Sequence, residues 1–222
     1  MTGDTSARPT GLNVRSLAAR LRSAVARTLF EQRLELDSSE FVGAADLGLQ
    51  NDEYQFYVPS QWLTLRTALW ARNPSPEDVF IDIGSGKGRV VIQAARYPFR
   101  RVIGLELSPA LTEVARRNLE RNRERLTCQR VELVTADLVD YEFPQDITIA
   151  YCYHSVAGRT FQVLMERLES VAQRRGAPIL FIYSNPLEHE AVLATGRARM
   201  VRRYPPRLHL RHALHLYEIS PW

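Results

Sequence analysis

The sequence predicts an α/β fold: a doubly wound, mostly parallel sheet with an N-terminal helical extension. The first observation behind this prediction is a strand, a glycine turn and a helix that follow one another over residues 79–95. The second is that further apolar, β-branched runs alternate with amphipathic helical patterns, as in βαβ units. The third is that successive strands end at acidic residues, on the edge where open α/β sheets bind ligands.

The length of 222 residues suits one α/β domain with an appendage. No apolar run approaches the roughly 18 residues that a membrane span needs, and no secretory signal is visible, so we expect a cytoplasmic protein. The two cysteines, Cys128 and Cys152, have no C-x-x-C spacing, and we expect neither a disulfide framework nor a metal site. The 29 basic residues include a single lysine, Lys87, a bias typical of GC-rich bacterial genomes.

The sequence of residues 1–60 predicts a tail, a helix and a flap. Apolar residues recur at helical spacing over 13–36 between many arginines, which indicates a basic amphipathic helix. This helix either packs on the domain edge with its arginines in solvent, or contacts a membrane surface or a nucleic acid, or forms a lid and dimer element. Residues 37–60 predict a loop whose aromatic end, Tyr57 to Ser60, is either a flap over the ligand or a hydrophobic anchor. We therefore divide the chain into residues 1–60 and an α/β domain over residues 61–222.

The glycine turn is the feature around which the domain is organised. Residues 79–83 predict a buried strand, glycines follow at positions 84, 86 and 88, and a helical pattern resumes at Val90. Such a turn needs backbone angles that other residues resist, and it lets a ligand approach the main chain. A dinucleotide fingerprint would place its third small residue where this chain has Arg89, so the spacing disfavours a nicotinamide-dependent oxidoreductase.

The remaining elements follow in order. We expect helices over 61–71, 109–125, 159–174 and 187–194, and strands over 101–106, 131–135, 147–151, 178–183, 200–204 and 210–219. Ser108 is suited to cap the helix that Pro109 begins. The last two strands are joined by a short turn and should pair antiparallel.

Two carboxylates should meet at the carboxyl edge of this sheet. Glu106 ends the second strand about 20 residues after the glycine turn, where a ribose diol needs an acceptor. Asp137 follows the third strand and reaches the same edge. Tyr153 and His154 follow the fourth strand, also at this edge.

The pattern D-x-G-x-G-x-G from Asp82 to Gly88 resembles motif I of the class I, Rossmann-like methyltransferases that depend on S-adenosylmethionine (SAM). With Glu106, Asp137 and the terminal hairpin, the resemblance covers roughly residues 57–220, and it implies a seven-stranded sheet of order 3-2-1-4-5-7-6. The motif, together with Tyr57-x-Pro59-Ser60, is similar to a largely uncharacterised bacterial group. It is more distantly similar to the seven-strand lysine methyltransferases.

The resemblance implies SAM as the cofactor, in a particular orientation. Asp82 would draw in the ammonium group, Glu106 would accept from the ribose hydroxyls, and Asp137 would accept from the adenine amino group. Leu107 and Leu138 would flank the adenine ring. The implied cofactor-binding residues are Asp82, Gly84, Ser85, Gly86, Gly88, Glu106, Leu107, Asp137, Leu138, Tyr57 and Ser60.

The methyl acceptor is where the chain departs from the bacterial group, which tends to carry Asn-Pro-Phe after the fourth strand. This chain has Tyr153-His154-Ser155 there, and we take His154 and Tyr153 as the catalytic candidates. His154 either removes a proton, orients the nucleophile, or is a hydrogen-bonding loop residue.

We expect a small-molecule acceptor, such as a natural-product intermediate, methylated on nitrogen or oxygen. A protein side chain of the lysine type and RNA are the alternatives, and a SAM-binding regulatory module without activity also stays open. The sequence carries no indication of the oligomeric state.

Overall fold

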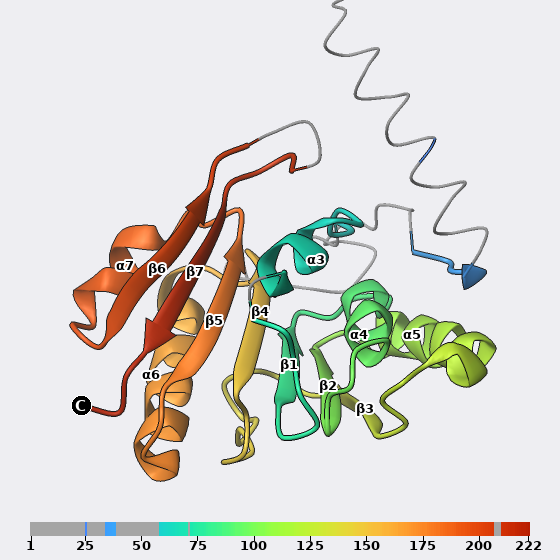
Figure 1. Ribbon diagram of the computed structural model, residues 1–222, viewed down its shortest axis with the longest axis horizontal. Helices are drawn as coiled ribbons and strands as arrows, with labels where there is room; N and C mark the ends of the chain where they lie inside the picture. Colours follow the sequence, from blue (N-terminus) through green and yellow to red (C-terminus); the bar gives the residue numbers. More distant parts are fainter. Residues whose placement is uncertain (1–24, 26–33, 39–57, 71, 207–209) are drawn as a thin grey trace, which may run out of the picture.

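The computed structural model of the protein describes residues 25, 34–38, 58–70, 72–206 and 210–222. In this part of the chain one seven-stranded sheet has the order β3-β2-β1-β4-β5-β7-β6 (Figure 1). Strands β1 to β5 are parallel, and β7 runs antiparallel to both β5 and β6. The predicted fold class and strand order are confirmed.

The elements have the following bounds. The strands are β1 (Val79–Ile83), β2 (Arg101–Glu106), β3 (Val131–Thr135), β4 (Ile149–Tyr153), β5 (Ile179–Ser184), β6 (Ala198–Tyr204) and β7 (Leu214–Ile219). The helices are α3 (Thr64–Leu69), α4 (Arg89–Ala95), α5 (Pro109–Asn122), α6 (Gly158–Arg175) and α7 (His189–Ala194), with a 3-10 turn η2 (Arg123–Arg125). The predicted cap is confirmed, since Ser108 Oγ accepts from the amide of Leu111 at 3.3 Å.

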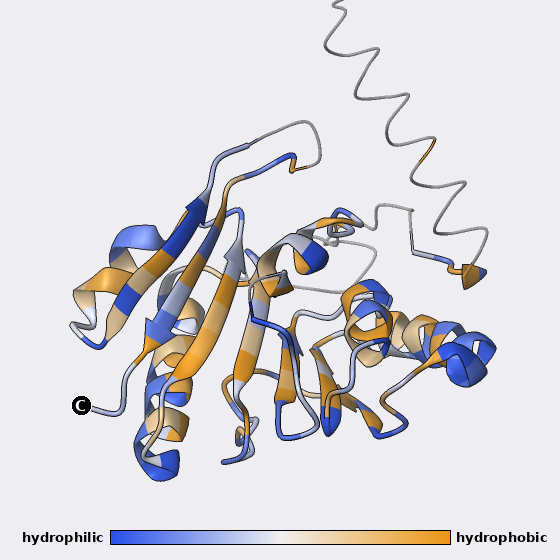
Figure 2. Ribbon diagram, viewed as in Figure 1, coloured by the Kyte–Doolittle hydropathy of each residue, from blue (hydrophilic) through white to orange (hydrophobic). Residues whose placement is uncertain are grey.

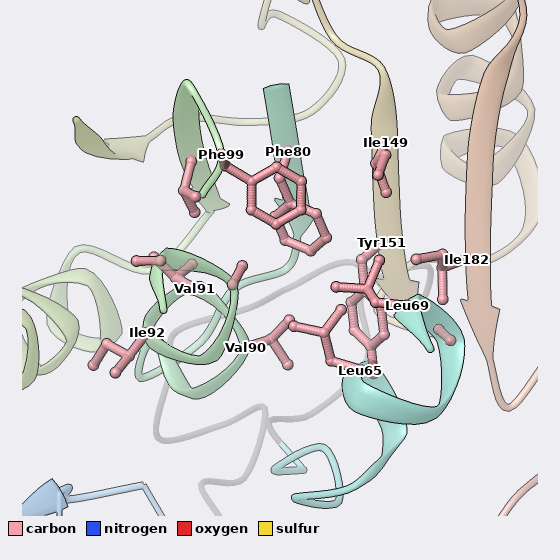
Figure 3. Packing of buried hydrophobic residues seen from close by; sticks show 14 of the residues in the cluster. Leu65, Leu69, Phe80, Val90, Val91, Ile92, Phe99, Ile149, Tyr151 and Ile182 are labelled. Carbon is pink, nitrogen blue, oxygen red and sulfur yellow. The ribbon is translucent and has the colours of Figure 1, made fainter. Parts of the chain in front are cut away.

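The sheet is covered on both faces, and this gives the molecule two hydrophobic cores. Residues of α3 and α4 pack on one face, and residues of α6 pack on the other. Strand β1 is buried along its whole length, as expected for the centre of a parallel sheet. Hydrophobic residues follow the central strands, whereas the edge strand β6 mixes hydrophilic and hydrophobic residues and is largely exposed (Figure 2). Leu65 and Leu69 of α3 lie against Tyr151 of β4 (Figure 3).

Strand β4 lies two residues further along the chain than the sequence predicts. The expected strand over 147–151 is observed at Ile149–Tyr153, because β5 continues to Ser184 and pairs with Tyr153 there. The preceding Thr148 is joined to β1 by its side chain, whose Oγ1 accepts from the amide of Val79 at 3.0 Å. Tyr153 is therefore a strand residue and not a loop residue.

Most of the N-terminal extension lies outside the described residues. This applies to the predicted basic helix over 13–36, apart from Val25 and residues 34–36, and to the aromatic flap with Tyr57. Among the described helices, none has both the length and the apolar character needed to cross a bilayer.

Candidate active site

The glycine turn is fixed to the end of β2 by its own main chain. Gly84, Gly86 and Gly88 all have positive φ angles, of 72°, 54° and 80°. The amides of Gly84 and Ser85 both donate to the carbonyl of Leu105, at 2.9 and 3.0 Å. The turn is therefore held directly over the carboxyl ends of β1 and β2.

Two of the glycines also allow neighbouring elements to approach closely. A Cβ atom on Gly84 would lie 2.3 Å from Cβ of Ser155, and one on Gly88 would lie 3.0 Å from Cβ of Ala115 on α5. The Ser155 hydroxyl donates to the carbonyl of Ile83 at 2.8 Å, which ties the loop after β4 to the glycine turn. Sequence reasoning did not single out Ser155, whose partner is 72 residues away in the chain.

The side chain of Ser85 faces the interior of the protein. A Cβ atom on Gly104 of β2 would lie 3.0 Å from Ser85 Oγ and 2.8 Å from Val91 of α4. The hydroxyl thus packs between the sheet and α4, where it finds no hydrogen-bond partner among the described residues. The predicted contact of Ser85 with a cofactor stays a prediction.

Two buried carboxylates form the electrostatic centre of the edge. Asp82 of β1 is 3% exposed and Glu106 of β2 is 9% exposed. Burial raises the pKa of Asp82 well above its ordinary value, and the negative charge of Glu106 raises it further. Because the ionised form of Asp82 is costly here, a ligand that places a positive charge beside it would be stabilised.

The negative charge of Glu106 is partly compensated by backbone amides around it. Its Oε2 accepts from the amide of Gly86 at 2.8 Å, and its Oε1 accepts from the amide of Ser108 at 2.9 Å. Burial raises the pKa of Glu106, and these two amides together with that of Leu107 oppose the rise. Each carboxylate oxygen keeps a further lone pair, so the group can still accept from hydroxyls of a ligand.

The end of β3 lies at the same carboxyl edge of the sheet as Asp82 and Glu106, because β3 is a parallel neighbour of β2. The amide of Ala136 donates to the carbonyl of Glu106 at 3.0 Å, and Asp137 follows directly. The Asp137 carboxylate is half-buried and accepts from the amide of Val139 at 2.8 Å. Leu107 is partly exposed at this edge, whereas Leu138 is buried in the core on the α6 side of the sheet.

Ser60 lies on the α3 side and is also engaged within the protein. Its hydroxyl accepts from the hydroxyl of Tyr151 at 3.0 Å, and its carbonyl accepts from the guanidinium of Arg89 at 2.9 Å. Ser60 is buried beside β4. Tyr57, predicted with it, lies outside the described residues.

Tyr153 and His154 lie on opposite sides of the sheet. Tyr153 packs against the core on the α3 side, with its ring centroid 5.9 Å from that of His212. His154 has a φ of 40°, and its Nδ1 lies 3.0 Å from the hydroxyl of Tyr183, which belongs to the opposite core. Burial lowers the pKa of His154, and Glu188 partly offsets this. Tyr183 is a functional candidate that the sequence did not reveal.

The comparison with protein families finds a match over the central part of the chain. Residues 80–176 match the family model described as a methyltransferase domain, from β1 to the end of α6. A protein-lysine N-methyltransferase of Saccharolobus islandicus (strain REY15A) is 31% identical over 67 residues. That match covers 30% of this chain and 42% of the relative, so the chain spans less than half of the relative's length.

Solved structures share the fold. An RNA methyltransferase from Salinibacter ruber, in complex with S-adenosyl-L-homocysteine, aligns with a TM-score of 0.52 at 21% identity. The alignment covers 74% of this chain and 95% of that one. A ribosomal protein L11 methylase from Lactobacillus delbrueckii subsp. bulgaricus aligns with a TM-score of 0.53 at 15% identity, over 71% of this chain and 77% of that one.

The strand order, the antiparallel β7 and the glycine turn define the class I, seven-strand methyltransferase fold. Residues 80–176 match a methyltransferase domain, and the described part of the chain has the fold of the class I SAM-dependent methyltransferases. The resemblance read from the sequence is confirmed.

Replacing Asp82 with asparagine should stabilise the ligand-free protein at neutral pH. Since burial raises the pKa of Asp82, the folded protein binds this proton more tightly than the unfolded chain, where an aspartate titrates near pH 3.9. The stability from this group is fully present below about pH 4 and is lost as the pH rises through the raised folded-state pKa. Asparagine has no carboxyl group to ionise, so the variant should not lose stability as the pH rises.

Thermal unfolding at pH 4 and pH 7 checks this prediction. The gain in Tm of Asp82→Asn should be present at pH 7 and absent at pH 4, and the exposed Asp140→Asn should show neither effect. A lower Tm for Asp82→Asn at pH 7 would mean that the fold already compensates the ionised carboxylate.

Proposed function

We propose that the protein transfers a methyl group from SAM to an acceptor and that the edge formed by β1, β2 and β3 holds the cofactor. The observation that carries this proposal is the buried pair Asp82 and Glu106 beside a turn of three positive-φ glycines. SAM has an ammonium group that suits the uncompensated Asp82 and a ribose diol that suits Glu106. The S. ruber neighbour with bound S-adenosyl-L-homocysteine supports this choice of ligand.

The remaining cofactor contacts follow the same edge. We infer that Asp137 accepts from the adenine amino group, that Leu107 and Leu138 flank the ring, and that Gly84 to Gly88 contact the methionine moiety through the main chain. Residues 61–222 are then the catalytic domain and residues 1–60 an extension of it. A cytoplasmic location belongs to this proposal.

SAM supplies an electrophilic methyl group on a sulfonium, which a nucleophile takes by in-line displacement. The protein forms no covalent bond in such a reaction, so its side chains contribute alignment of the acceptor and exclusion of water. An amine acceptor only has to arrive deprotonated, whereas a hydroxyl acceptor needs a base or a polarising group.

We assign His154 the role of orienting the acceptor. The amide of Glu188 donates to the Tyr183 oxygen at 3.4 Å, which leaves the Tyr183 hydroxyl proton free to bond Nδ1 of His154. With Tyr183 as the donor, the neutral imidazole carries its proton on Nε2, and burial lowers the pKa of His154, which favours the neutral ring. His154 then presents a donor rather than a base. Its left-handed backbone, unusual for a residue other than glycine, is in keeping with a functional position.

A small molecule is the acceptor we favour. His154 is a partly buried imidazole at the end of β4, and its partner Tyr183 is an aromatic residue, which are side chains of the kind that line small-molecule pockets. A protein side chain of the lysine type is the second candidate, because the S. islandicus relative is a protein-lysine N-methyltransferase. RNA is the third candidate, because the S. ruber neighbour is an RNA methyltransferase.

Transfer of a labelled methyl group from SAM into a fractionated cell extract separates these candidates. We expect the label in the low-mass fraction; label in protein or in RNA would replace the small molecule by the second or third candidate. Tight SAM binding without transfer to any fraction would indicate a regulatory SAM-binding module.

Glu106→Ala should weaken SAM binding by about 10- to 150-fold. This follows if one charge-assisted hydrogen bond to the ribose, worth about 1.5–3 kcal/mol, is lost. Isothermal titration calorimetry with SAM, S-adenosylhomocysteine and NAD measures the effect. The wild type should bind the first two in preference to NAD.

The matched control is Glu113→Ala, which removes an exposed carboxylate from α5 and should keep the wild-type affinity. An unchanged SAM affinity in Glu106→Ala would remove this residue from the cofactor site.

His154→Ala should lower turnover by roughly 100-fold, the loss typical of a misplaced reactant, while leaving SAM affinity nearly unchanged. Because an imidazole and an imidazolium can both donate from Nε2, the acidic limb of the pH–rate profile should stay as in the wild type. Tyr183→Phe keeps the ring but loses the hydroxyl, and it should lower turnover in the same direction by a smaller factor.

Steady-state kinetics over pH 5 to 9 checks this assignment once an acceptor is known. Loss of the acidic limb in His154→Ala would make His154 the base. Wild-type turnover would leave it a loop residue without a role in the reaction.

A further inference from the structure

The only lysine of the chain lies inside the glycine turn, and its side chain is buried. Lys87 is 5% exposed, and its Nζ lies 3.1 Å from Oδ1 of Asp37, which precedes it by 50 residues. The Asp37 side chain is half-exposed. An ammonium group that is buried to this degree needs a partner, because an unpaired buried charge is costly. The turn is therefore tied to a segment far upstream.

Asn118 of α5 joins the same two segments through the main chain. Its Nδ2 donates to the carbonyl of Lys87 at 2.9 Å and to the carbonyl of Asp37 at 3.0 Å. Its Oδ1 accepts from the amide of Asp37 at 3.0 Å. Asn118 is fully buried, so these bonds form without competition from water. One side chain thus fixes the backbone of the turn and the backbone of the upstream segment to each other.

The two ends of the upstream segment have their own anchors. Nδ2 of Asn122 donates to the carbonyl of Leu34 at 2.6 Å, and Leu34 is buried in the core on the α3 side. At the other end, Nε of Arg89 donates to Ser38 Oγ at 3.0 Å. Arg89 is also buried, and its guanidinium lies 4.7 Å from the ring centre of Trp62. Residues 34–38 are therefore held against α5 at one end, against α4 at the other, and against the turn at Asp37.

We propose that Lys87 is a positioning residue that couples the docking of residues 34–38 to cofactor binding by the glycine turn. This inference rests on the proposed function, since it takes the turn to be the SAM-binding element. Lys87 itself does not contact the ligand in this account. Its ammonium holds Asp37, and Asn118 transmits that contact to the carbonyl of Lys87, so that the turn keeps the backbone angles that Gly86 and Gly88 show.

Coupling of this kind is reciprocal. If docking of residues 34–38 favours SAM binding, then SAM binding must favour docking by the same factor. The amide of Asp37 reports on docking, because its hydrogen bond to Asn118 Oδ1 protects it from exchange with solvent only while the segment is docked. A residue with a merely structural role would change stability without linking these two observables.

The test combines calorimetry with hydrogen–deuterium exchange on the full chain. In the wild type, saturating SAM should slow exchange in the peptide that contains residues 34–38. Lys87→Met keeps the length and loses the charge, and it should weaken SAM binding by roughly 5- to 150-fold, the range typical of coupled sites. It should also reduce the SAM-dependent protection of that peptide.

Two further variants keep the test decisive. Asp37→Asn changes the half-exposed partner and should weaken SAM binding in the same direction even if Lys87→Met folds poorly. Arg117→Met removes an exposed charge from α5, the helix that carries Asn118, and should change neither observable.

The outcomes separate the inference from the function on which it rests. Wild-type SAM affinity in both Lys87→Met and Asp37→Asn, with no effect of SAM on exchange in residues 34–38, would overturn the coupling and leave the proposed function standing. A wild-type protein that does not bind SAM would overturn the proposed function, and the coupling with it.

Discussion

The burial of two carboxylates on adjacent strands is the constraint on which the rest of this structure depends. Asp82 and Glu106 come near each other because β1 and β2 are parallel neighbours that reach the same edge of the sheet, where Asp82 pairs with Gly104, two residues before Glu106. The fold compensates Glu106 with amides of the glycine turn and of the α5 N-terminus. It leaves Asp82 with a strongly raised pKa. An edge with this imbalance is stabilised by a ligand that carries a positive charge.

The glycine turn above this pair is also the point where distant parts of the chain meet. Ser155 reaches it from the loop after β4, Ala115 packs on it from α5, and Asp37 contacts it from upstream of the domain. A side chain on Gly84 would collide with Ser155 whether or not a ligand is present. The glycines thus serve the packing of the protein as well as the approach of a cofactor, and the shape of the cofactor site depends on contacts made outside it.

Local sequence signals were enough to predict much of the fold. The apolar run of β1 with its glycine turn and the cap at Ser108 are visible over a few residues, and the structure has both. The strand order came from the resemblance to the methyltransferases, and it is confirmed. The end of β4 was misplaced by two residues, because that boundary is set by pairing with β5 and not by the local apolar pattern.

The contacts that shape the candidate site were harder to predict. The bonds of Ser155, Tyr183 and Lys87 join residues that are 72, 29 and 50 positions apart, and no periodicity in a sequence reports a contact of that kind. Side-chain direction was equally hidden: Ser85 faces Gly104 in the interior, and Tyr153 and His154 leave the sheet on opposite sides. The assigned roles of the individual site residues therefore remain predictions.

The central claim is that a cationic cofactor occupies the edge at Asp82, and proton exchange on SAM binding tests it most directly. A positive charge beside this carboxylate must lower its raised pKa, so binding should release protons. Calorimetric titration of SAM between pH 5 and pH 7.5, in buffers that differ in ionisation enthalpy, gives the number of protons released. We predict net proton release by the wild type and its loss in Asp82→Asn. Binding of SAM without proton exchange, or with proton uptake, would contradict the account.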